Sequence, residues 1–235
     1  MHRLRGAGGV SIVRTIPNYV VLYNESETYT LGKLYGSAVI MRDGIRLTPA
    51  TTGQVGYYVY SPPTLNYSAF YIRFFFRTGL GNGADAVWVG LFDDTYSGTT
   101  EDVVKNGYHF TYDEYEERVA FTKSVVDNGP PICSASVSRS YFMDYNWHRA
   151  EVIFDRTKMR AKIYLDGSLK VDCIDTMYGY SGMVAGIPRG ASQGTGVIVL
   201  GGRTGGLHNE HWVKNILVVA FPQPVNIDNI PAGVM

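Results

Sequence analysis

The segment Tyr108–Glu117 (YHFTYDEYEE) gathers oxygen-bearing side chains that could bind a cation. If this segment is extended, alternate side chains point to opposite faces, so Asp113, Tyr115 and Glu117 share one face. Hard cations such as Ca²⁺ are bound by carboxylate, carbonyl and water oxygens. The pattern therefore predicts a calcium site, and its alternative interpretation is the solvated acidic end of a strand.

A second group of residues, Gly81–Asp85 (GNGAD), places a carboxylate directly before the apolar run Ala86–Phe92. Burying an unpaired carboxylate is costly, so Asp85 is expected at the rim of whatever core that run enters. There it could accept hydrogen bonds from a ligand. The alternative is that Asp85 only caps the turn, because Asp is a common turn residue.

A third group, Gly201–His211 (GGRTGGLHNEH), is rich in glycine. Glycine has no Cβ, so its backbone N–H groups can approach a ligand closely. The segment therefore predicts a ligand-contacting loop, and its alternative interpretation is a plain flexible surface loop.

The elements that must position these groups are short strands. Apolar and aromatic runs alternate with turn residues, and helical periodicity is nearly absent, which favours an all-β antiparallel β-sandwich of jelly-roll type. A hairpin turn is expected at Asp155–Lys158, and another turn at Asp166–Gly167. The expected strands include Tyr57–Tyr60, Phe70–Arg77, Ala86–Phe92, Glu151–Phe154, Lys162–Leu165, Val197–Leu200 and Trp212–Val219.

Composition excludes several classes of protein. Apolar residues make up 45% of the 235 residues and charged residues 18%, which rules out intrinsic disorder. Lys plus Arg and Asp plus Glu are 21 each, so the basic surface needed for nonspecific nucleic-acid binding is not expected. No apolar run is long enough to predict a membrane-spanning helix, and no signal peptide is visible.

The domain organisation is expected to be simple. The segment 1–17 is predicted to be an N-terminal extension or edge strand, 18–225 a single sandwich domain, and 226–235 a C-terminal tail. Cys133 and Cys173 are too few for a zinc module. They could form one disulfide or remain two free thiols, and their spacing alone does not decide.

The order of several motifs resembles the L-type (legume-type) lectins, a family with the concanavalin A-like sandwich. The resemblance is nearest to the cargo-receptor lectins of the secretory pathway. The motifs are Asp43–Ala50 (DGIRLTPA) followed by Gln54, the strand Phe70–Phe76, Ala84–Asp85, Phe110–Glu117, and Thr204–Leu207 (TGGL) followed by His211.

The resemblance implies non-catalytic carbohydrate binding in a shallow rim pocket. By it, Asp85 would accept charge-assisted hydrogen bonds from sugar hydroxyls, and Gly205, Gly206 and Leu207 would contact the sugar through backbone and shape. Two further residues, Gly83 and Tyr108, are expected to flank the same pocket.

The resemblance also implies a structural Ca²⁺ beside the pocket. Asp113 would ligate it through the side chain and Tyr115 through the carbonyl. Glu117, which stands where the family has an Asn that touches both calcium and sugar, is expected to take that place. A Glu can ligate calcium, but it cannot donate the amide hydrogen bond to the sugar. Asp93 and Asp94 are further candidate ligands in the same region.

A second metal is not expected, because Thr111 stands where seed lectins carry the Glu of a transition-metal site. The resemblance further implies that Cys133 and Cys173 form a disulfide, that the protein is extracellular, at the cell surface or in a secretory compartment, and that it associates as a homo-oligomer. Its expected partners are glycans or glycoproteins, with no nucleic acid.

Two alternative functions stay open from the residues. One is a structural or adhesion domain whose sugar site is degenerate, which the changes at Thr111 and Glu117 would favour. The other is a glycoside hydrolase of the same fold, which needs two nearby carboxylates. Glu114 and Glu116 would share a strand face, although they do not reproduce the glucanase pattern E-x-D-x-E.

Overall fold

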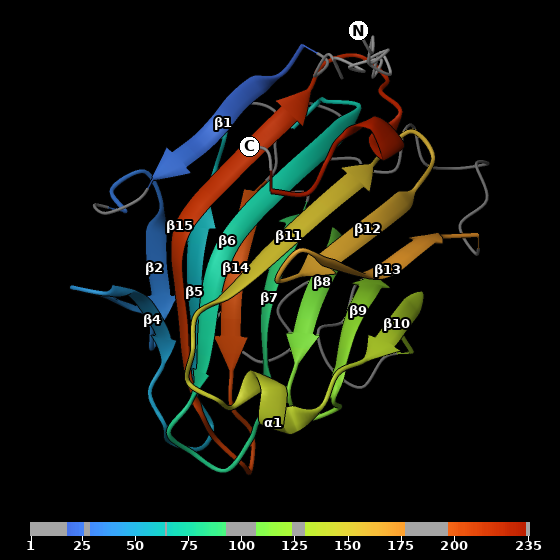
Figure 1. Cartoon of the computed structure of the whole chain (residues 1–235). Helices are drawn as coiled ribbons and strands as arrows, with labels where there is room; N and C mark the ends of the chain where they lie inside the picture. The colour runs from blue at the N-terminus through green and yellow to red at the C-terminus, as the bar shows by residue number, and fades with distance from the viewer. Residues whose placement is uncertain are drawn as a thin grey trace, which may run out of the picture.

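The protein is a sandwich of two antiparallel β-sheets, seen in a computed structural model (Figure 1). The structure describes residues 18–25, 29–63, 65–92, 107–123, 130–176 and 197–233. The expected all-β antiparallel sandwich is confirmed. Asp93 and Asp94, two of the candidate calcium ligands, lie outside the described residues.

The larger sheet has eight strands within the described residues. Its long central strands are β6 and β15, and β15 pairs with β4 near its start and with β1 along its second half. In spatial order the strands are β13 (Ser168–Ile174), β12 (Arg160–Leu165), β11 (His148–Asp155), β6 (Ala69–Gly79), β15 (Glu210–Phe221), β4 (Gly44–Thr48) and β3 (Val39–Met41), with β1 (Val20–Glu25) beside β15.

The smaller sheet has seven strands in the same described ranges. Its centre is β7, which pairs with β8 on one side and with β14 on the other. In spatial order the strands are β10 (Cys133–Ser136), β9 (Arg118–Lys123), β8 (Gly107–Asp113), β7 (Ala86–Phe92), β14 (Val197–Arg203), β5 (Val55–Tyr60) and β2 (Lys33–Gly36).

The core between the sheets is aromatic. Along β6, the side chains of Phe70, Ile72, Phe74 and Phe76 alternate into this core and are fully buried. The ring of Phe110 stacks on that of Phe121, with centroids 5.4 Å apart. The aromatic run in β6 thus packs the sandwich, as its period of two predicts. All seven strand runs named from the sequence lie within strands of the structure.

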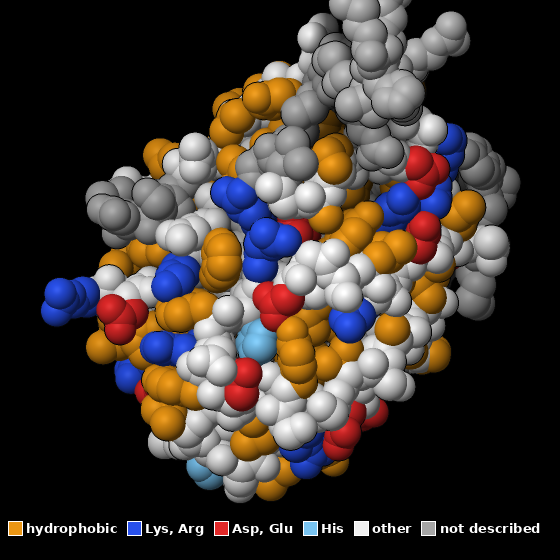
Figure 2. All heavy atoms as spheres, viewed as in Figure 1, with side chains coloured by type: hydrophobic (Ala, Val, Ile, Leu, Met, Phe, Trp, Pro, Cys, Tyr) orange, Lys and Arg blue, Asp and Glu red, His pale blue; other side chains and the backbone are white. Residues whose placement is uncertain are grey.

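The outer face of the larger sheet carries cations and aromatic rings. Figure 2 shows Lys and Arg side chains gathered over β15 and β6. The guanidinium of Arg77 lies over the rings of Tyr145, Trp147 and Trp212, at 4.2 to 4.9 Å from their centroids. A hollow of about 580 Å³ on this face is lined by Tyr29, Arg42, Asp43, Gly44, Trp147, Lys214 and Asn215. None of the predicted site residues lines that hollow.

The C-terminal segment packs on the sandwich instead of forming the expected tail. Ile227 and Ile230 are buried against the outer face of the larger sheet, and a short 3-10 helix spans Ile227–Asn229. The backbone N–H of Gly233 donates to Glu151 on β11, and Asp228 pairs with Arg160. The packed unit therefore runs past residue 225, because two isoleucines there cover apolar surface.

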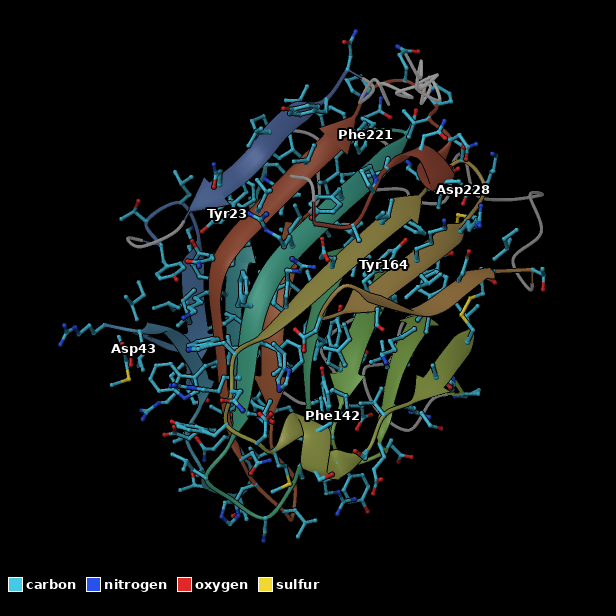
Figure 3. All side chains as sticks on the ribbon, in the orientation of Figure 1. Tyr23, Asp43, Phe142, Tyr164, Phe221 and Asp228 are labelled. Atoms are coloured by element: carbon cyan, nitrogen blue, oxygen red, sulfur yellow. A yellow bond between two sulfur atoms is a disulfide. The ribbon has the colours of Figure 1, made fainter. Side chains whose placement is uncertain are left out.

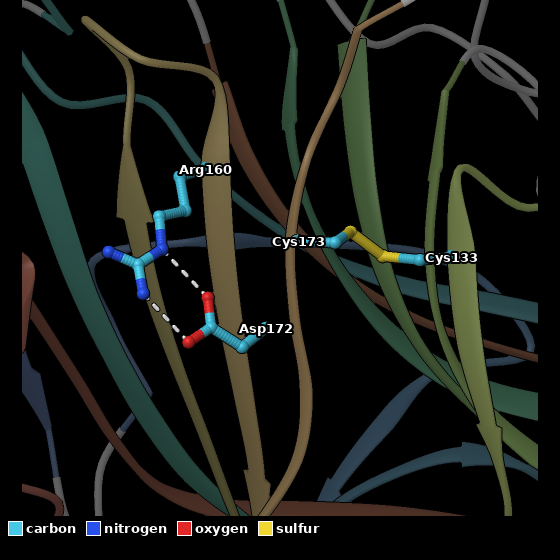
Figure 4. Close-up of a disulfide and its surroundings, with 4 residues drawn as sticks. All are labelled: Cys133, Arg160, Asp172 and Cys173. Carbon is cyan, nitrogen blue, oxygen red and sulfur yellow. Dashed lines mark hydrogen bonds and ion pairs between the residues drawn. A yellow bond between two sulfur atoms is a disulfide. The ribbon is translucent and has the colours of Figure 1, made fainter.

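A disulfide joins the edges of the two sheets. Cys133 of β10 and Cys173 of β13 are bonded, with their Cα atoms 6.7 Å apart (Figure 4). The structure thus pairs the two thiols that spacing alone left open. On the neighbouring strand β12, Arg160 pairs with Asp172 through two hydrogen bonds (Figure 4).

Removing this disulfide is predicted to destabilise the protein. The bridge closes a loop with a sequence separation of 40 residues, and such a loop is worth about 3–4 kcal/mol in the chain-entropy model. The double variant Cys133→Ser/Cys173→Ser should lose that free energy of unfolding in urea titration. Loss of less than about 1 kcal/mol would contradict a stabilising bridge.

A buried histidine predicts a pH dependence of stability. His109 on β8 is fully buried beside Trp88, and burial lowers the pKa of its imidazole from 6.5 to about 3. Below pH 6.5 the imidazole of the unfolded chain binds a proton that the folded chain does not bind. The free energy of unfolding therefore falls as the pH is lowered. Between pH 7 and pH 5 this loss is about 2 kcal/mol.

The variant His109→Gln should show a smaller fall over that interval, by about the same 2 kcal/mol. The comparison uses the difference between the two pH values, so a uniform loss of stability in the variant cancels. An equal fall in both proteins would contradict the assignment to His109.

Candidate functional site

The candidate site lies at the lower end of the sandwich in Figure 1, where several strands end or begin. Strand β6 ends at Gly79, β8 at Asp113 and β14 at Arg203, while β7 begins at Ala86 and β15 at Glu210. The loops that carry the sequence motifs therefore meet at one rim. Antiparallel pairing of β7 with both β8 and β14 brings them together, since Ala86 is opposite Asp113 and Arg203.

Asp85 is held from both sides by backbone hydrogen bonds. Its N–H donates to the carbonyl of Arg203 (2.9 Å). Its carbonyl accepts from the N–H groups of Glu114 (3.1 Å) and Tyr115 (3.2 Å). The peptide bond between Ala84 and Asp85 is cis. The three hydrogen bonds fix the position of the Asp85 backbone between β14 and the turn after β8.

The Asp85 carboxylate is partly exposed and paired. Its Oδ2 accepts a hydrogen bond from Arg203 Nε at 2.9 Å, and 13% of the side chain is exposed. A carboxylate can accept about four hydrogen bonds. As predicted from the sequence, the acid lies at the rim.

The glycine-rich loop lies directly against this carboxylate. A Cβ on Gly205 would come within 3.0 Å of Asp85 Oδ2, so a side chain there would crowd the acid. Gly206 is exposed and a Cβ there would touch nothing within 4 Å, and Leu207 is half-buried. The structure thus brings Asp85, Gly205, Gly206 and Leu207 together at one rim.

Hydrogen bonds tie the glycine-rich loop to its neighbours. The N–H of His208 donates to Asn82 Oδ1 (2.7 Å), and the N–H of Asn82 donates to the His208 carbonyl (2.8 Å). The Thr204 hydroxyl donates to the Thr51 carbonyl (2.7 Å), while its N–H donates to Gln54 (2.8 Å). Because these hydrogen bonds anchor the loop, the alternative interpretation of a plain flexible surface loop does not apply.

A buried polar network supports the rim from below. Glu114 Oε1 accepts a hydrogen bond from Asn209 Nδ2 (2.7 Å) and pairs with His211 Nε2 (2.9 Å). His211 Nδ1 in turn pairs with the Thr48 hydroxyl (2.6 Å). All four side chains are fully buried. The network links β4, β15 and the turn after β8.

The ionised form of Glu114 is stabilised by this network. Burial alone would raise the pKa of its carboxyl group, but the charge of His211 and hydrogen bonds from His211 and Asn209 hold that pKa below its usual value. Removing the carboxylate would leave buried donors on His211 and Asn209 unsatisfied. Such losses are among the costliest single changes in a protein.

The acid pair required by the hydrolase alternative is not assembled. Strand β8 ends at Asp113, so the period-two pattern assumed for Glu114 and Glu116 stops there. Glu114 turns into the interior and is fully buried, whereas Glu116 is exposed. The prediction that both acids share one face is wrong, because the chain enters a turn at residue 114.

Two residues predicted to flank the pocket are buried. Tyr108 is at the other end of β8 and is 1% exposed, and its hydroxyl donates to Asp175 in the interior. Gly83 is buried, and a Cβ there would clash with the side chains of Arg139 and Met143. Tyr108 therefore packs the core away from the rim, which corrects its prediction, while Gly83 stays in the loop before Asp85 and makes room for the arginine.

The oxygens expected to bind calcium have other partners in the structure. Asp113 Oδ1 accepts from the N–H of Glu116 (2.8 Å). The Tyr115 carbonyl accepts from Arg139 Nη2 (2.8 Å), and the Glu117 carboxylate lies 3.8 Å from Arg139 Nε. Within the described ranges, no three His, Cys, Asp or Glu side chains are placed to hold a metal ion. This donor set, with a guanidinium among the oxygens, does not fit Ca²⁺.

Sequence reasoning missed Arg139 and Arg203. Arg139 comes from a short helix, α1 (Arg139–Phe142), whose contact with the turn after β8 depends on tertiary packing that no local pattern reveals. Arg203 was open to prediction. It is the last residue of β14, directly before the TGGL motif, and so had to lie at the same rim as Asp85.

Comparisons with known proteins identify the fold. No protein-family profile and no curated protein sequence matches the chain. Among solved structures, a lectin from Bauhinia forficata in complex with GalNAc is similar, with 13% identity, a TM-score of 0.66, and coverage of 88% of this chain and 100% of that one. The chain has the L-type lectin fold, as the motif resemblance predicts.

Two further similar structures are of metal-bound forms. The VIP36 exoplasmic/lumenal domain in its Ca²⁺/Man-bound form has 14% identity and a TM-score of 0.63, covering 83% of this chain and 84% of that one. The Emp46p carbohydrate recognition domain in its potassium-bound form has 12% identity and a TM-score of 0.59, with coverage of 87% and 97%. At these identities the likeness establishes the fold.

Glu114→Ala is predicted to destabilise the rim and the protein. The change removes the acceptor for Asn209 and His211 in a fully buried site, which costs about 3–5 kcal/mol. The matched control is Glu116→Ala, two residues away and exposed, which should change stability by less than about 0.5 kcal/mol. Equal free energies of unfolding for the two variants would contradict the role given to Glu114.

Proposed function

We propose that this protein binds glycans non-catalytically at the rim formed by Asp85 and the loop Gly205–Leu207. The proposal rests on one observation: the partly exposed carboxylate of Asp85 lies beside the backbone of two glycines, Gly205 and Gly206. A carboxylate accepts charge-assisted hydrogen bonds from hydroxyl groups, and these are about twice as strong as neutral ones. Gly205 and Gly206 leave space for a sugar ring beside that acid.

Tyr115 is a further candidate contact in the proposed pocket. Its side chain is 48% exposed, and its N–H donates to the carbonyl of Asp85. An aromatic ring can pack its face against the apolar face of a sugar while the neighbouring carboxylate accepts hydroxyls. Asp85 and Tyr115 would thus supply the polar and the apolar parts of recognition.

Proteins with the same fold support this proposal. One of the similar structures is described in complex with GalNAc, another in a Ca²⁺/Man-bound form, and a third as a carbohydrate recognition domain. Sugar binding by proteins of this shape makes a glycan the favoured ligand class. Calcium and potassium are named for two of these proteins, but in this chain the guanidinium of Arg139 already occupies the Tyr115 carbonyl.

The proposed location is extracellular or within the secretory pathway. A disulfide between Cys133 and Cys173 is typical of an oxidising compartment, and the similar VIP36 domain is described as exoplasmic/lumenal. Across the described residues, no helix has the length and apolar character needed to span a bilayer.

A structural or adhesion domain with a degenerate sugar site is the second candidate. It is favoured by the ion pair between Asp85 and Arg203, because a paired acid is a weaker acceptor for an incoming ligand. The Glu117 carboxylate also pairs with Arg139, so it does not take the role that the family's Asn would have toward calcium and sugar. The two candidates make opposite predictions for glycan binding.

The test compares wild-type protein with Asp85→Asn on a glycan array, followed by titration calorimetry with the glycans that bind. Losing a charged acceptor costs about 1.5–3 kcal/mol, so the Kd should rise about 10- to 100-fold. Asp43→Asn is the matched control, since Asp43 is exposed in the turn between β3 and β4 (Figure 3). Its affinity should equal that of the wild type.

Unchanged affinity in Asp85→Asn, with its thermal unfolding curve intact, would place the sugar elsewhere and overturn the proposed pocket. Absence of binding by the wild type across the array would favour the structural or adhesion candidate instead.

A further inference from the structure

Arg139 places a permanent positive charge among the oxygens of the turn after β8. Its Nε donates to the Glu114 carbonyl (3.1 Å) and its Nη2 to the Tyr115 carbonyl (2.8 Å). The carboxylate of Glu117 lies beside the same guanidinium, with Oε1 3.8 Å from Nε. One cation is thus surrounded by two carbonyl oxygens and a carboxylate, the oxygen donors that a hard metal ion would use.

The arginine and a metal ion would compete for the same oxygen. The Tyr115 carbonyl, expected from the sequence resemblance as a calcium ligand, already accepts from Arg139 at 2.8 Å. A divalent ion bound to that carbonyl would lie close to the guanidinium, and two like charges at such short range repel strongly. Arg139 cannot lose its charge to relieve this repulsion, because guanidinium stays protonated in proteins.

The helix that carries Arg139 is fixed in place. Phe142 of α1 is fully buried at the lower end of the sandwich, where its ring lies 6.3 Å from that of Phe76 (Figure 3). The Thr78 hydroxyl donates to the Phe142 carbonyl (2.7 Å). The N–H of Val137, just before the helix, donates to the carbonyl of Glu117 (2.8 Å). The guanidinium is therefore positioned by the packing of Phe142 and by hydrogen bonds before and within the helix.

The aliphatic part of Arg139 also contacts the loop that carries Asp85. Gly83 has a φ of +91°, and a Cβ there would come within 2.9 Å of Arg139 Cδ. Glycine thus allows the arginine stem to lie against the loop two residues before the proposed sugar-binding acid. Arg139 thus contacts both loops, Gly81–Asp85 and Glu114–Glu117.

Asp113, the other expected side-chain ligand among the described residues, is also engaged. Asp113 Oδ1 accepts from the N–H of Glu116, and Oδ2 lies 3.9 Å from Arg118 Nε. Asp113 is 4% exposed, so its carboxylate faces the turn and not solvent. Its bonds stabilise the same turn that Arg139 holds from the other side.

We propose that the guanidinium of Arg139 takes the place of calcium in this protein. It neutralises the turn Glu114–Glu117 and holds it against the Asp85 loop, so the rim forms without a metal ion. The consequence for ligand binding rests on the proposed function: glycan affinity is the same in calcium and in chelator. The consequence for metal binding and stability does not depend on any sugar.

The test measures calcium binding and thermal unfolding of the full chain, with no glycan present. Wild type, Arg139→Met and Arg160→Met are each titrated with CaCl₂ by calorimetry and melted in EDTA and in millimolar CaCl₂. Arg160→Met is the matched control, because Arg160 is a partly exposed arginine in an ion pair at the start of β12, at the opposite end of the sheet from α1.

The wild type should give no binding heat with CaCl₂ and the same Tm in both solutions. Arg139→Met should melt about 3–10 °C lower than the wild type in EDTA, since it loses two charged hydrogen bonds. CaCl₂ should then raise the Tm of Arg139→Met, because the Tyr115 carbonyl and the Glu117 carboxylate become available to the ion. Arg160→Met should not respond to calcium.

Calcium binding by the wild type, or a Tm that EDTA lowers, would overturn the proposal, and this result does not need any variant to fold. A Tm of Arg139→Met equal to that of the wild type would overturn it as well. If Arg139→Met is destabilised but calcium does not raise its Tm, Arg139 is an ordinary ion-pair partner and not a replacement for calcium. The glycan result for Asp85→Asn stands apart from all three outcomes.

Discussion

The position of Asp85 depends on hydrogen bonds made by its backbone. Its N–H donates to β14 at Arg203, and its carbonyl accepts from Glu114 and Tyr115 in the turn after β8. An acid on an unsupported loop would lose conformational entropy when ligand binding orders the loop, and this loss would weaken binding. Here the strands β7, β8 and β14 place the partners before any ligand is present, so the core of the sandwich determines the geometry at its rim.

The turn after β8 is stabilised by opposite charges on its two sides. On the inner side, the buried carboxylate of Glu114 pairs with His211 and Asn209. On the outer side, the guanidinium of Arg139 holds the carbonyl oxygens of Glu114 and Tyr115. The inner network connects the turn to β15, and the outer contact connects it to α1. Together they keep the amides that bind the Asp85 carbonyl in place.

The sequence predicts the strands well and the turn poorly, and the reason is physical. A continuous apolar run identifies β7, and period-two alternation identifies β6 because side chains on each face meet the same environment along the whole strand. The same rule, extended past Asp113, wrongly puts Glu114 beside Glu116, because a local pattern does not say where pairing with β9 stops. Glu117 adopts a φ of +55°, which reverses the chain at that point. Arg139 and the packed segment after residue 225 depend on distant contacts, which only the assembled fold reveals.

The rim around Asp85 is preformed by the protein's own bonds. Hydrogen–deuterium exchange tests it at the two amides of Glu114 and Tyr115, which donate to the Asp85 carbonyl. Exchange is followed in metal-depleted protein and again after CaCl₂ is added. We expect slow exchange at both amides, with the same rates in both samples. Fast exchange in the depleted protein that calcium slows would contradict it, because the rim would then need a metal ion to form.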